Sequence, residues 1–298
     1  MIRTVMDPGA AEPYAGVLMG VLALDSTRPR QSLRSRGEVL LRRSGGAWLA
    51  TVIVGQLVFA IYIIIVYGRA ALRHTLGDRS VFFHHGYVAG DDAGNTAVAL
   101  HILFAIVVNL AGAAQLIPQL RQRAPTFHRW NGRVFLVGVC TIALAGVYMT
   151  WVRGAVGDNS QHVAGTLDAI LIVTFAALAL RAAVAREIDA HRRWALRLFM
   201  VVSGSWFFRL AVMLWIAVNR GPVGFNPDTF TGPFLTFMAF AEYLVPLAVL
   251  ECYLRTQQPS GAPYRVAIAT SLFALTLLMA AGIAAVTATM WLPSILGR

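Results

Sequence analysis

Four histidines occupy matched places along the most apolar part of the chain. His101 and His162 lie near the start of two apolar runs, and His128 and His191 immediately precede two others. Because consecutive membrane spans alternate in direction, each of these pairs shares one face of the bilayer. Neutral imidazoles on two facing helices are the axial ligands that a six-coordinate b-type haem requires. Two such pairs, one near each face, predict a path for electrons across the membrane.

Arginine and tryptophan accompany the second histidine pair in a repeated motif. The stretches "FHRWNGRVFL" and "AHRRWALRLF" both place a tryptophan three residues before an arginine. Three interpretations are open. The motif anchors helices at the membrane border, or its arginines bind haem propionates, or it binds an anionic substrate, a quinone or a lipid headgroup. The arginines concerned are Arg129, Arg133, Arg192 and Arg197.

Three ionisable residues interrupt the apolar runs, where each charge costs about 2.5–3.5 kcal/mol on insertion scales. Arg209 lies ten residues from the end of its run, about 15 Å along a helix. Glu242 lies nine residues from the same face, about 13.5 Å. The matched depth predicts a buried ion pair between adjacent helices, with Asp168 as the alternative partner of Arg209. Such a pair is either structural or lines a cavity for a substrate or cofactor.

The elements that must position these residues are membrane-spanning helices. Hydrophobic residues make up 57% of the 298 residues and charged residues 13%, against roughly 25% charged residues in soluble domains. The apolar runs are continuous and long enough to cross a hydrocarbon core of about 30 Å, which excludes the alternating pattern of membrane β-strands. We predict an all-α polytopic bundle with seven spans: Gly46–Gly68, Thr96–Leu120, Val134–Trp151, Val163–Leu180, Leu198–Asn219, Pro233–Leu254 and Val266–Trp291.

The arginines are distributed unequally between the two ends of these spans. The chain has no lysine, and eighteen of its 25 basic residues fall on the N-terminal side, against six on the opposite side. Because basic loops stay in the cytoplasm, we expect a multi-pass inner-membrane protein with a cytoplasmic N-terminus and an external C-terminus. Residues 1–45 form a cytoplasmic tail that is either disordered or associated with the membrane surface. Residues 46–298 form a single domain, with a functional core at 96–219.

The region from the second to the fifth span resembles a family of bacterial integral membrane proteins, the domain of unknown function 2306. The resemblance rests on the stretches "LHILFAIVVNLAGAAQLIPQLRQRAPTFHRWNGRVFLVGV" and "IDAHRRWALRLFMVVSGSWFFRLAV". It implies a fold and a topology, and no activity. The shared residues are His101, Gln115, His128–Trp130, Gly132, Arg133, His191–Trp194, Arg197 and Arg209.

The placing of the histidines on four consecutive spans also resembles the two-haem transmembrane cytochromes b. Those proteins reduce a substrate at one face with electrons from the other. The resemblance lies in the arrangement alone. The present chain departs from it because His128 and His191 precede their apolar runs. Helices that begin upstream of these runs would bring the two residues into register.

Other kinds of site have less support. His84 and His85 stand near Asp91 and Asp92, but adjacent histidines in a loop point in different directions, so we predict no metal site. The sequence has no P-loop, nucleophile elbow or zinc-protease motif, and it assigns no enzymatic reaction. The positive charge follows the membrane topology and gives no reason to expect nucleic acid.

These observations lead to three hypotheses for the function. The leading one is haem b binding with electron transfer across the lipid bilayer, served by a quinone or another redox partner. The second is a transporter, or a lipid- or anion-binding protein, that uses the intramembrane Arg209 and Glu242. The third is a non-catalytic subunit of a larger membrane complex.

Overall fold

The computed structural model describes residues 12–73, 87–154, 157–257 and 261–297. Within these ranges the chain is helical, apart from its connections and one isolated β-bridge between Asn226 and Thr231. The helices are α1 Glu12–Leu72, α2 Asp92–Leu116, α3 Pro118–Arg123, α4 Pro125–Trp151, α5 Asn159–Val184, α6 Ile188–Val202, α7 Gly204–Asn219, α8 Pro233–Arg255, α9 Ala262–Val286 and α10 Leu292–Leu296. A π-helical turn, η2, covers Thr287–Trp291 between α9 and α10.

Six of the helical segments are long and apolar enough to cross a membrane. A seventh span is formed if α6 and α7, which meet at a bend of 45°, are taken as one broken span. The prediction of an all-helical polytopic fold is therefore confirmed, and side chains such as Phe237, Leu144 and Leu277 are exposed on the outside of the bundle, where they contact lipid.

Several helices begin before the apolar runs that the sequence displays. α4 begins at Pro125 instead of Val134, α6 at Ile188 instead of Leu198, and α1 at Glu12. Polar residues can continue a helix beyond the hydrocarbon, so hydropathy marks the buried part of a span and misses its ends. The early starts of α4 and α6 place His128 and His191 inside their helices.

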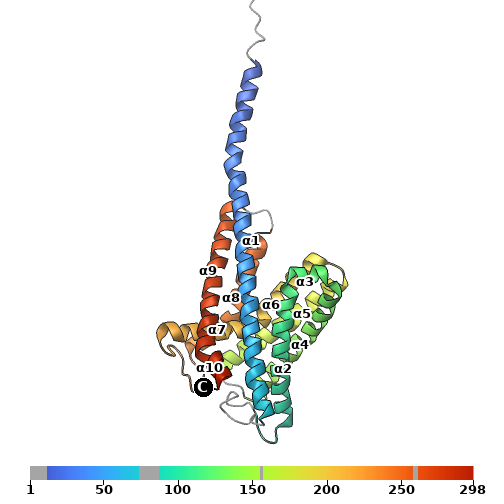
Figure 1. Ribbon diagram of the computed structural model, residues 1–298, viewed down its shortest axis with the longest axis vertical. Helices are drawn as coiled ribbons and strands as arrows, with labels where there is room; N and C mark the ends of the chain where they lie inside the picture. Colours follow the sequence, from blue (N-terminus) through green and yellow to red (C-terminus); the bar gives the residue numbers. More distant parts are fainter. Residues whose placement is uncertain (1–11, 74–86, 155–156, 258–260, 298) are drawn as a thin grey trace, which may run out of the picture.

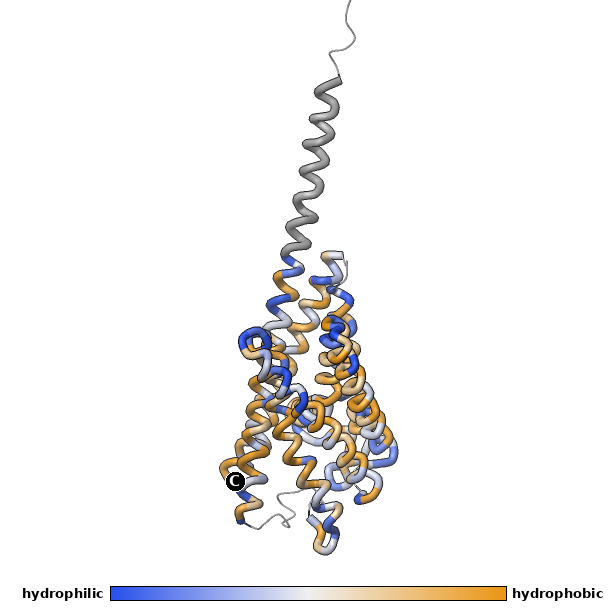
Figure 2. Tube along the Cα trace, turned by 90° about the vertical axis from the view of Figure 1, so that its right-hand side faces the viewer, coloured by the Kyte–Doolittle hydropathy of each residue, from blue (hydrophilic) through white to orange (hydrophobic). Residues whose placement is uncertain are grey.

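The helices form one bundle, with α1 extending past it at the N-terminal end (Figure 1). α1 packs along α9 on one side and contacts α2 on the other, and α4 lies between α2 and α5. α6 contacts α5 and α8, while α7 packs on α8 and α9. Figure 2 shows hydrophobic residues along most of the length of the bundle and hydrophilic residues concentrated at the loops and helix ends.

Local sequence signals explain where several helices begin. The side chain of Asp91 accepts a hydrogen bond from the backbone N–H of Gly94 at the start of α2, and Asp158 accepts one from Gln161 at the start of α5. These carboxylates satisfy N–H groups that a helix start leaves unpaired. α3, α4, α8 and α9 each carry a proline in the first turn, where no N–H is needed.

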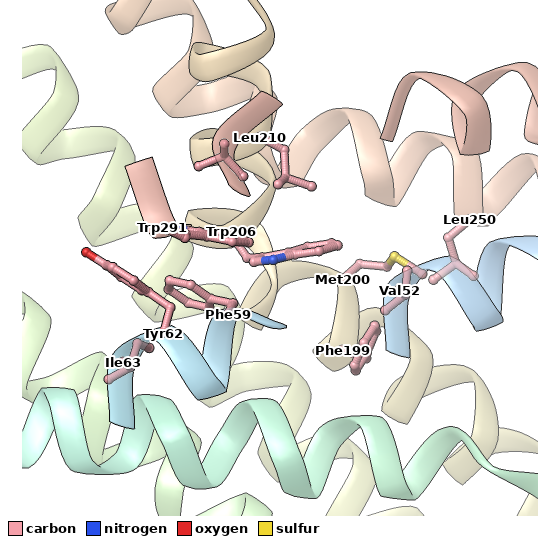
Figure 3. Close-up of a cluster of buried hydrophobic side chains, with 11 residues drawn as sticks. Val52, Phe59, Tyr62, Ile63, Phe199, Met200, Trp206, Leu210, Leu250 and Trp291 are labelled. Atoms are coloured by element: carbon pink, nitrogen blue, oxygen red, sulfur yellow. The ribbon is translucent and has the colours of Figure 1, made fainter. Parts of the chain in front are cut away.

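The main buried cluster joins α1 to the helices of the second half of the chain (Figure 3). The rings of Phe59, Tyr62 and Trp291 lie together, with 5.2 Å between the ring centroids of Phe59 and Trp291. Trp206 of α7 packs directly on the backbone of α1 at Gly55, where an added Cβ would lie 2.5 Å from its Cζ2 atom. The absence of a side chain at Gly55 therefore allows α1 and α7 to approach closely.

Candidate functional site

The broken span formed by α6 and α7 places a bend next to a carboxylate. The break lies at Ser203 and Gly204, and Gln56 of α1 donates a hydrogen bond of 3.1 Å to the hydroxyl of Ser203. Glu242 of α8 lies against Gly204, where an added Cβ would be 3.6 Å from its Oε1 atom. A carboxylate at this position faces the first turn of α7, whose dipole favours a negative charge.

The second helix at this site, α8, is continuous but lacks one backbone hydrogen bond. Pro246 lies inside α8, four residues after Glu242. A proline has no N–H, so it cannot donate the helical hydrogen bond to the backbone carbonyl of Glu242. Broken helices are tolerated at membrane depth where they are buried in protein or line a water-filled site. Glu242 thus lies near the break at Ser203, and its own backbone carbonyl lacks the helical donor that Pro246 cannot supply.

Arg209 lies between the bend and the aromatic cluster. Its Nη1 donates a hydrogen bond to the carbonyl of Ser205, one turn earlier in α7, and its guanidinium lies 5.4 Å from the ring centroid of Phe59. The positive charge of Arg209 interacts electrostatically with the carboxyl group of Glu242. Within the described ranges, however, no carboxylate lies within 4.0 Å of the guanidinium. Arg209 and Glu242 therefore interact only at longer range, and the direct ion pair predicted from their depth is absent from the described residues.

His101 and Asp168 complete this group of intramembrane polar residues. The charge of Arg209 acts on His101, and that of Asp168 acts on Glu242. The Nδ1 atom of His101 and the Oδ1 atom of Asp168 are both covered and have no hydrogen-bond partner in the part of the chain that the structure describes. We call these four residues, from four different helices, the polar centre. Its unpartnered atoms are costly unless a ligand or a proton satisfies them.

The two histidines of the first predicted pair contact different residues of α4. The ring of His101 lies against α4 at Ile142 and Gly146, where an added Cβ would be 3.9 Å from His101 Cε1. His162 packs edge-on against Trp151 at the end of α4, with 5.7 Å between the ring centroids. Trp151 follows Gly146 by five positions, about 7.5 Å along a helix. The two histidines therefore contact parts of α4 that are more than one turn apart.

The second histidine pair lies at the N-terminal ends of α4 and α6. His191 of α6 acts electrostatically on His128 of α4, and the Nδ1 atom of His191 lies 2.9 Å from the carbonyl of Ala179. Because a carbonyl only accepts, Nδ1 carries the proton and the Nε2 lone pair of His191 is available to a ligand. The Nδ1 atom of His128 is covered and without a partner among the described residues. The backbone carbonyl of His128 accepts from Gln115, which ties α2 to α4.

The repeated tryptophan–arginine spacing has a structural explanation. Residues three apart on a helix are neighbours, and in both copies the guanidinium lies over the ring of the preceding tryptophan. The distances to the ring centroid are 4.7 Å for Arg133 over Trp130 and 4.6 Å for Arg197 over Trp194. The motif therefore forms a cation–π pair at the N-terminal end of α4 and again in α6.

The four arginines predicted near this border differ in their surroundings. Arg197 donates to both carboxylate oxygens of Glu251 in α8, at 2.7 and 3.0 Å. Arg129 is exposed and reaches the hydroxyl of Thr126 at 3.4 Å, and Arg133 and Arg192 are also exposed. Arg197 thus joins two helices, whereas the other three face outward, as border residues do.

Sequence reasoning missed several residues that shape the site. Glu251, Gln56 and Ser203 make their contacts across helices, and none of them stands out in the sequence. Pro246 carried a usable signal, because a proline four residues after an intramembrane carboxylate predicts a free carbonyl at that residue. His84 and His85 lie outside the described residues.

Comparison with known protein families matches the middle of the chain. Residues 98–245 match a family described as predicted membrane protein, DUF2306. The matched region runs from α2 into α8 and includes all four residues of the polar centre. No curated protein and no solved structure matches the chain.

Proposed function

We propose that this chain, whose residues 98–245 belong to the DUF2306 family of predicted membrane proteins, binds a small carboxylate anion at Arg209 within the membrane. The function is that of a carrier or an anion-binding membrane protein. The proposal rests on the guanidinium of Arg209, which lies near the bend between α6 and α7. Among the described residues, its one hydrogen-bond acceptor is the carbonyl of Ser205. A guanidinium presents five donors in a fork that matches a carboxylate, so most of its capacity is available.

Two features of the surrounding helices support an anion at this place. The first turn of α7 begins at Gly204, so its N–H groups and dipole favour negative charge next to Arg209. The break at Ser203 is typical of carriers that bind substrates near mid-membrane with discontinuous helices. Phe59 limits the space beside the guanidinium, which favours a small ligand over a lipid headgroup.

The test uses lactate as the anion and lactamide as its uncharged analogue. Thermal unfolding of the detergent-purified chain is measured with each compound for wild type, Arg209→Gln and Arg193→Gln. Arg193 is an exposed arginine of α6 and serves as the matched control. Lactate should raise the unfolding temperature of wild type and Arg193→Gln but not of Arg209→Gln, and lactamide should have no effect. An equal lactate effect in Arg209→Gln would refute the proposal.

A carrier and a binding protein are then separated by counterflow. Proteoliposomes loaded with unlabelled lactate accumulate labelled lactate transiently if the chain is a carrier. Accumulation in wild type and its loss in Arg209→Gln supports transport, whereas binding without counterflow assigns the chain to the binding class.

Haem b at the N-terminal end of the bundle is a second candidate, favoured by the arrangement of His191. Its Nδ1 proton is held by Ala179, as in many metal-binding histidines, and His128 is its neighbour. A haem there would carry electrons, and a quinone or redox protein would exchange them. Protein purified after growth with added haem should show a Soret band that is lost in His191→Ala. The absence of that band in wild type excludes this candidate and leaves the lactate test unaffected.

The localisation that we propose is the inner membrane with the N-terminal side in the cytoplasm. It is supported by the excess of arginine on the N-terminal side, including Arg121 and Arg123 at the end of α3 and Arg129 near the start of α4. A cysteine introduced after Asn219, at the opposite end, should react with an impermeant thiol reagent in intact cells. Labelling that needs permeabilised cells would reverse the orientation.

A further inference from the structure

The two copies of the tryptophan–arginine motif occupy matched places in the bundle. In each copy a phenylalanine follows the arginine by two residues. The rings of Phe135 in α4 and Phe199 in α6 both lie against Gly112 of α2, where an added Cβ would be 3.0 and 3.4 Å from them. Both tryptophan–arginine pairs therefore lie near the C-terminal end of α2, and their surroundings can be compared directly.

In the second copy an acidic side chain completes the pair. Arg197 lies over the ring of Trp194 and donates to both carboxylate oxygens of Glu251. The ring of Phe175 packs on Trp194, with 5.6 Å between the ring centroids. A guanidinium held over an aromatic ring thus presents two parallel N–H donors to an anionic group with two oxygens. This copy shows which chemical group the arrangement accepts.

In the first copy the same arrangement has no acidic partner. Arg133 lies over Trp130 at almost the same distance as in the second copy, but Trp130 is 61% exposed. Within the ranges that the structure describes, no carboxylate lies within 4.0 Å of the guanidinium of Arg133 or of Arg129. The N–H donors of Arg133 are therefore open to an anion from outside the bundle.

Arg129 and Arg133 lie one helical turn apart on α4. Like charges at positions i and i+4 repel each other and destabilise a helix, whereas an anion bound between them removes this repulsion. α4 begins at Pro125, so the helix dipole also favours negative charge at this end. Two guanidiniums at this spacing suit the phosphate diester of a lipid headgroup, which carries one negative charge on two terminal oxygens.

The outward face of α4 continues from these arginines as an apolar surface. Val137 lies one turn after Arg133, Leu144 lies two turns after Val137, and both side chains are exposed. Residues at such spacings share one face of a helix. A ligand whose phosphate lies at Arg129 and Arg133 can therefore lay its acyl chains along this face. A free phosphate would leave the face uncovered, so the combination favours a phospholipid.

We propose that Arg129, Trp130 and Arg133 form a binding site for the headgroup of an anionic phospholipid at the N-terminal end of α4. The phosphate takes the role that the carboxylate of Glu251 has in the second copy, and the acyl chains lie along the exposed face of α4. Binding is non-covalent. The site is on a different helix from Arg209, so it goes beyond the proposed anion binding and does not depend on it.

The test measures the binding of phosphatidylglycerol to the detergent-purified full-length chain by native mass spectrometry. Phosphatidylcholine with the same acyl chains is the comparison without net charge, and glycerol 3-phosphate supplies the headgroup phosphate without acyl chains. The test variant carries Arg129→Gln and Arg133→Gln together. The matched control carries Arg121→Gln and Arg123→Gln, which remove two exposed arginines of α3.

Wild type and the α3 control should bind the first phosphatidylglycerol at least about tenfold more tightly than phosphatidylcholine, because a charge-assisted bidentate contact contributes about that factor. The α4 variant should bind both lipids equally, and glycerol 3-phosphate should not compete. A retained preference in the α4 variant, or an equal loss in the α3 control, would overturn the site. Competition by glycerol 3-phosphate would overturn the assignment to a lipid.

Single variants keep the test decisive if the α4 double variant does not fold. Arg129→Gln and Arg133→Gln should each lose part of the preference for phosphatidylglycerol, whereas Arg123→Gln should keep all of it. A full preference in both α4 single variants would overturn the site.

Discussion

Arg197 and Glu251 form a bidentate ion pair that joins α6 to α8. The Nε and Nη2 atoms of Arg197 donate to the two carboxylate oxygens at 2.7 and 3.0 Å, and the same guanidinium covers the ring of Trp194. The side chain of Arg197 is 19% exposed. The pair lies on the N-terminal side of the bend at Ser203, so it fixes α6 on α8 while α7 takes its own direction.

The first prediction concerns this ion pair. Glu251→Gln should lower the free energy of unfolding by about 1 kcal/mol, because it removes the charge but keeps part of the hydrogen bonding at a partly exposed site. Arg197→Gln should cost more, because the stacking on Trp194 is lost as well. Denaturation in mixed detergent micelles measures both. Additive effects in the double variant would show that the two residues do not interact in solution.

The second prediction concerns the close contact of α1 and α7. Gly55→Ala places a methyl group 2.5 Å from Trp206 and 2.6 Å from Ile283, and we expect a loss of about 1–3 kcal/mol from overpacking. Gly46→Ala is the matched control on the same helix, because an added Cβ there meets nothing within 4 Å. Unfolding temperatures compare the two variants. Equal unfolding temperatures of the two variants would mean that α1 and α7 can move apart without a loss of stability.

The third prediction concerns the hydrogen bond that α8 lacks. Pro246→Ala supplies the missing N–H donor to the carbonyl of Glu242, so α8 should become more regular and the protein more stable, by less than about 3 kcal/mol. If the missing hydrogen bond serves anion binding, the lactate-induced rise in unfolding temperature should fall in the same variant. Pro233→Ala is the control, because a proline in the first helical turn replaces no hydrogen bond. Unchanged lactate binding in Pro246→Ala would show that the missing hydrogen bond in α8 is not needed for anion binding.

The fourth prediction concerns the cap of α5 and its dependence on pH. The backbone N–H of Gln161 donates to the carboxylate of Asp158, and this bond lowers the pKa of Asp158 below its ordinary value of 3.8. A lowered pKa in the folded state means that the ionised carboxylate stabilises the protein at neutral pH and that this contribution disappears as the pH falls below 3.8. Asp158→Asn should therefore flatten the acid limb of a plot of unfolding temperature against pH. The hydroxyl of Thr236, which also donates to Asp158, should keep its position in the Asp158→Asn variant.

The sequence alone determined the class of the protein and the approximate course of its spans. Long apolar segments must cross a bilayer as helices because lipid offers no partner to backbone N–H and carbonyl groups, and this rule depends only on local composition. The fifth span was more difficult. We predicted its apolar run as one span, although the run contains Ser203, Gly204 and Ser205, a combination at which helices often bend. The structure has a 45° bend there, and Gln56 of α1 donates a hydrogen bond to Ser203.

Only the tertiary structure decided which polar residues meet. Depth arguments predicted an ion pair between Arg209 and Glu242, because rise along a helix is a local property, but the described residues contain no direct ion pair between them. The same arguments placed His101 beside His162, whereas the two contact different levels of α4. Facing partners depend on how each helix is rotated and tilted against its neighbours, which packing between distant segments sets and hydropathy does not record. For that reason the membrane bundle could be predicted from the chain, and the polar centre could not.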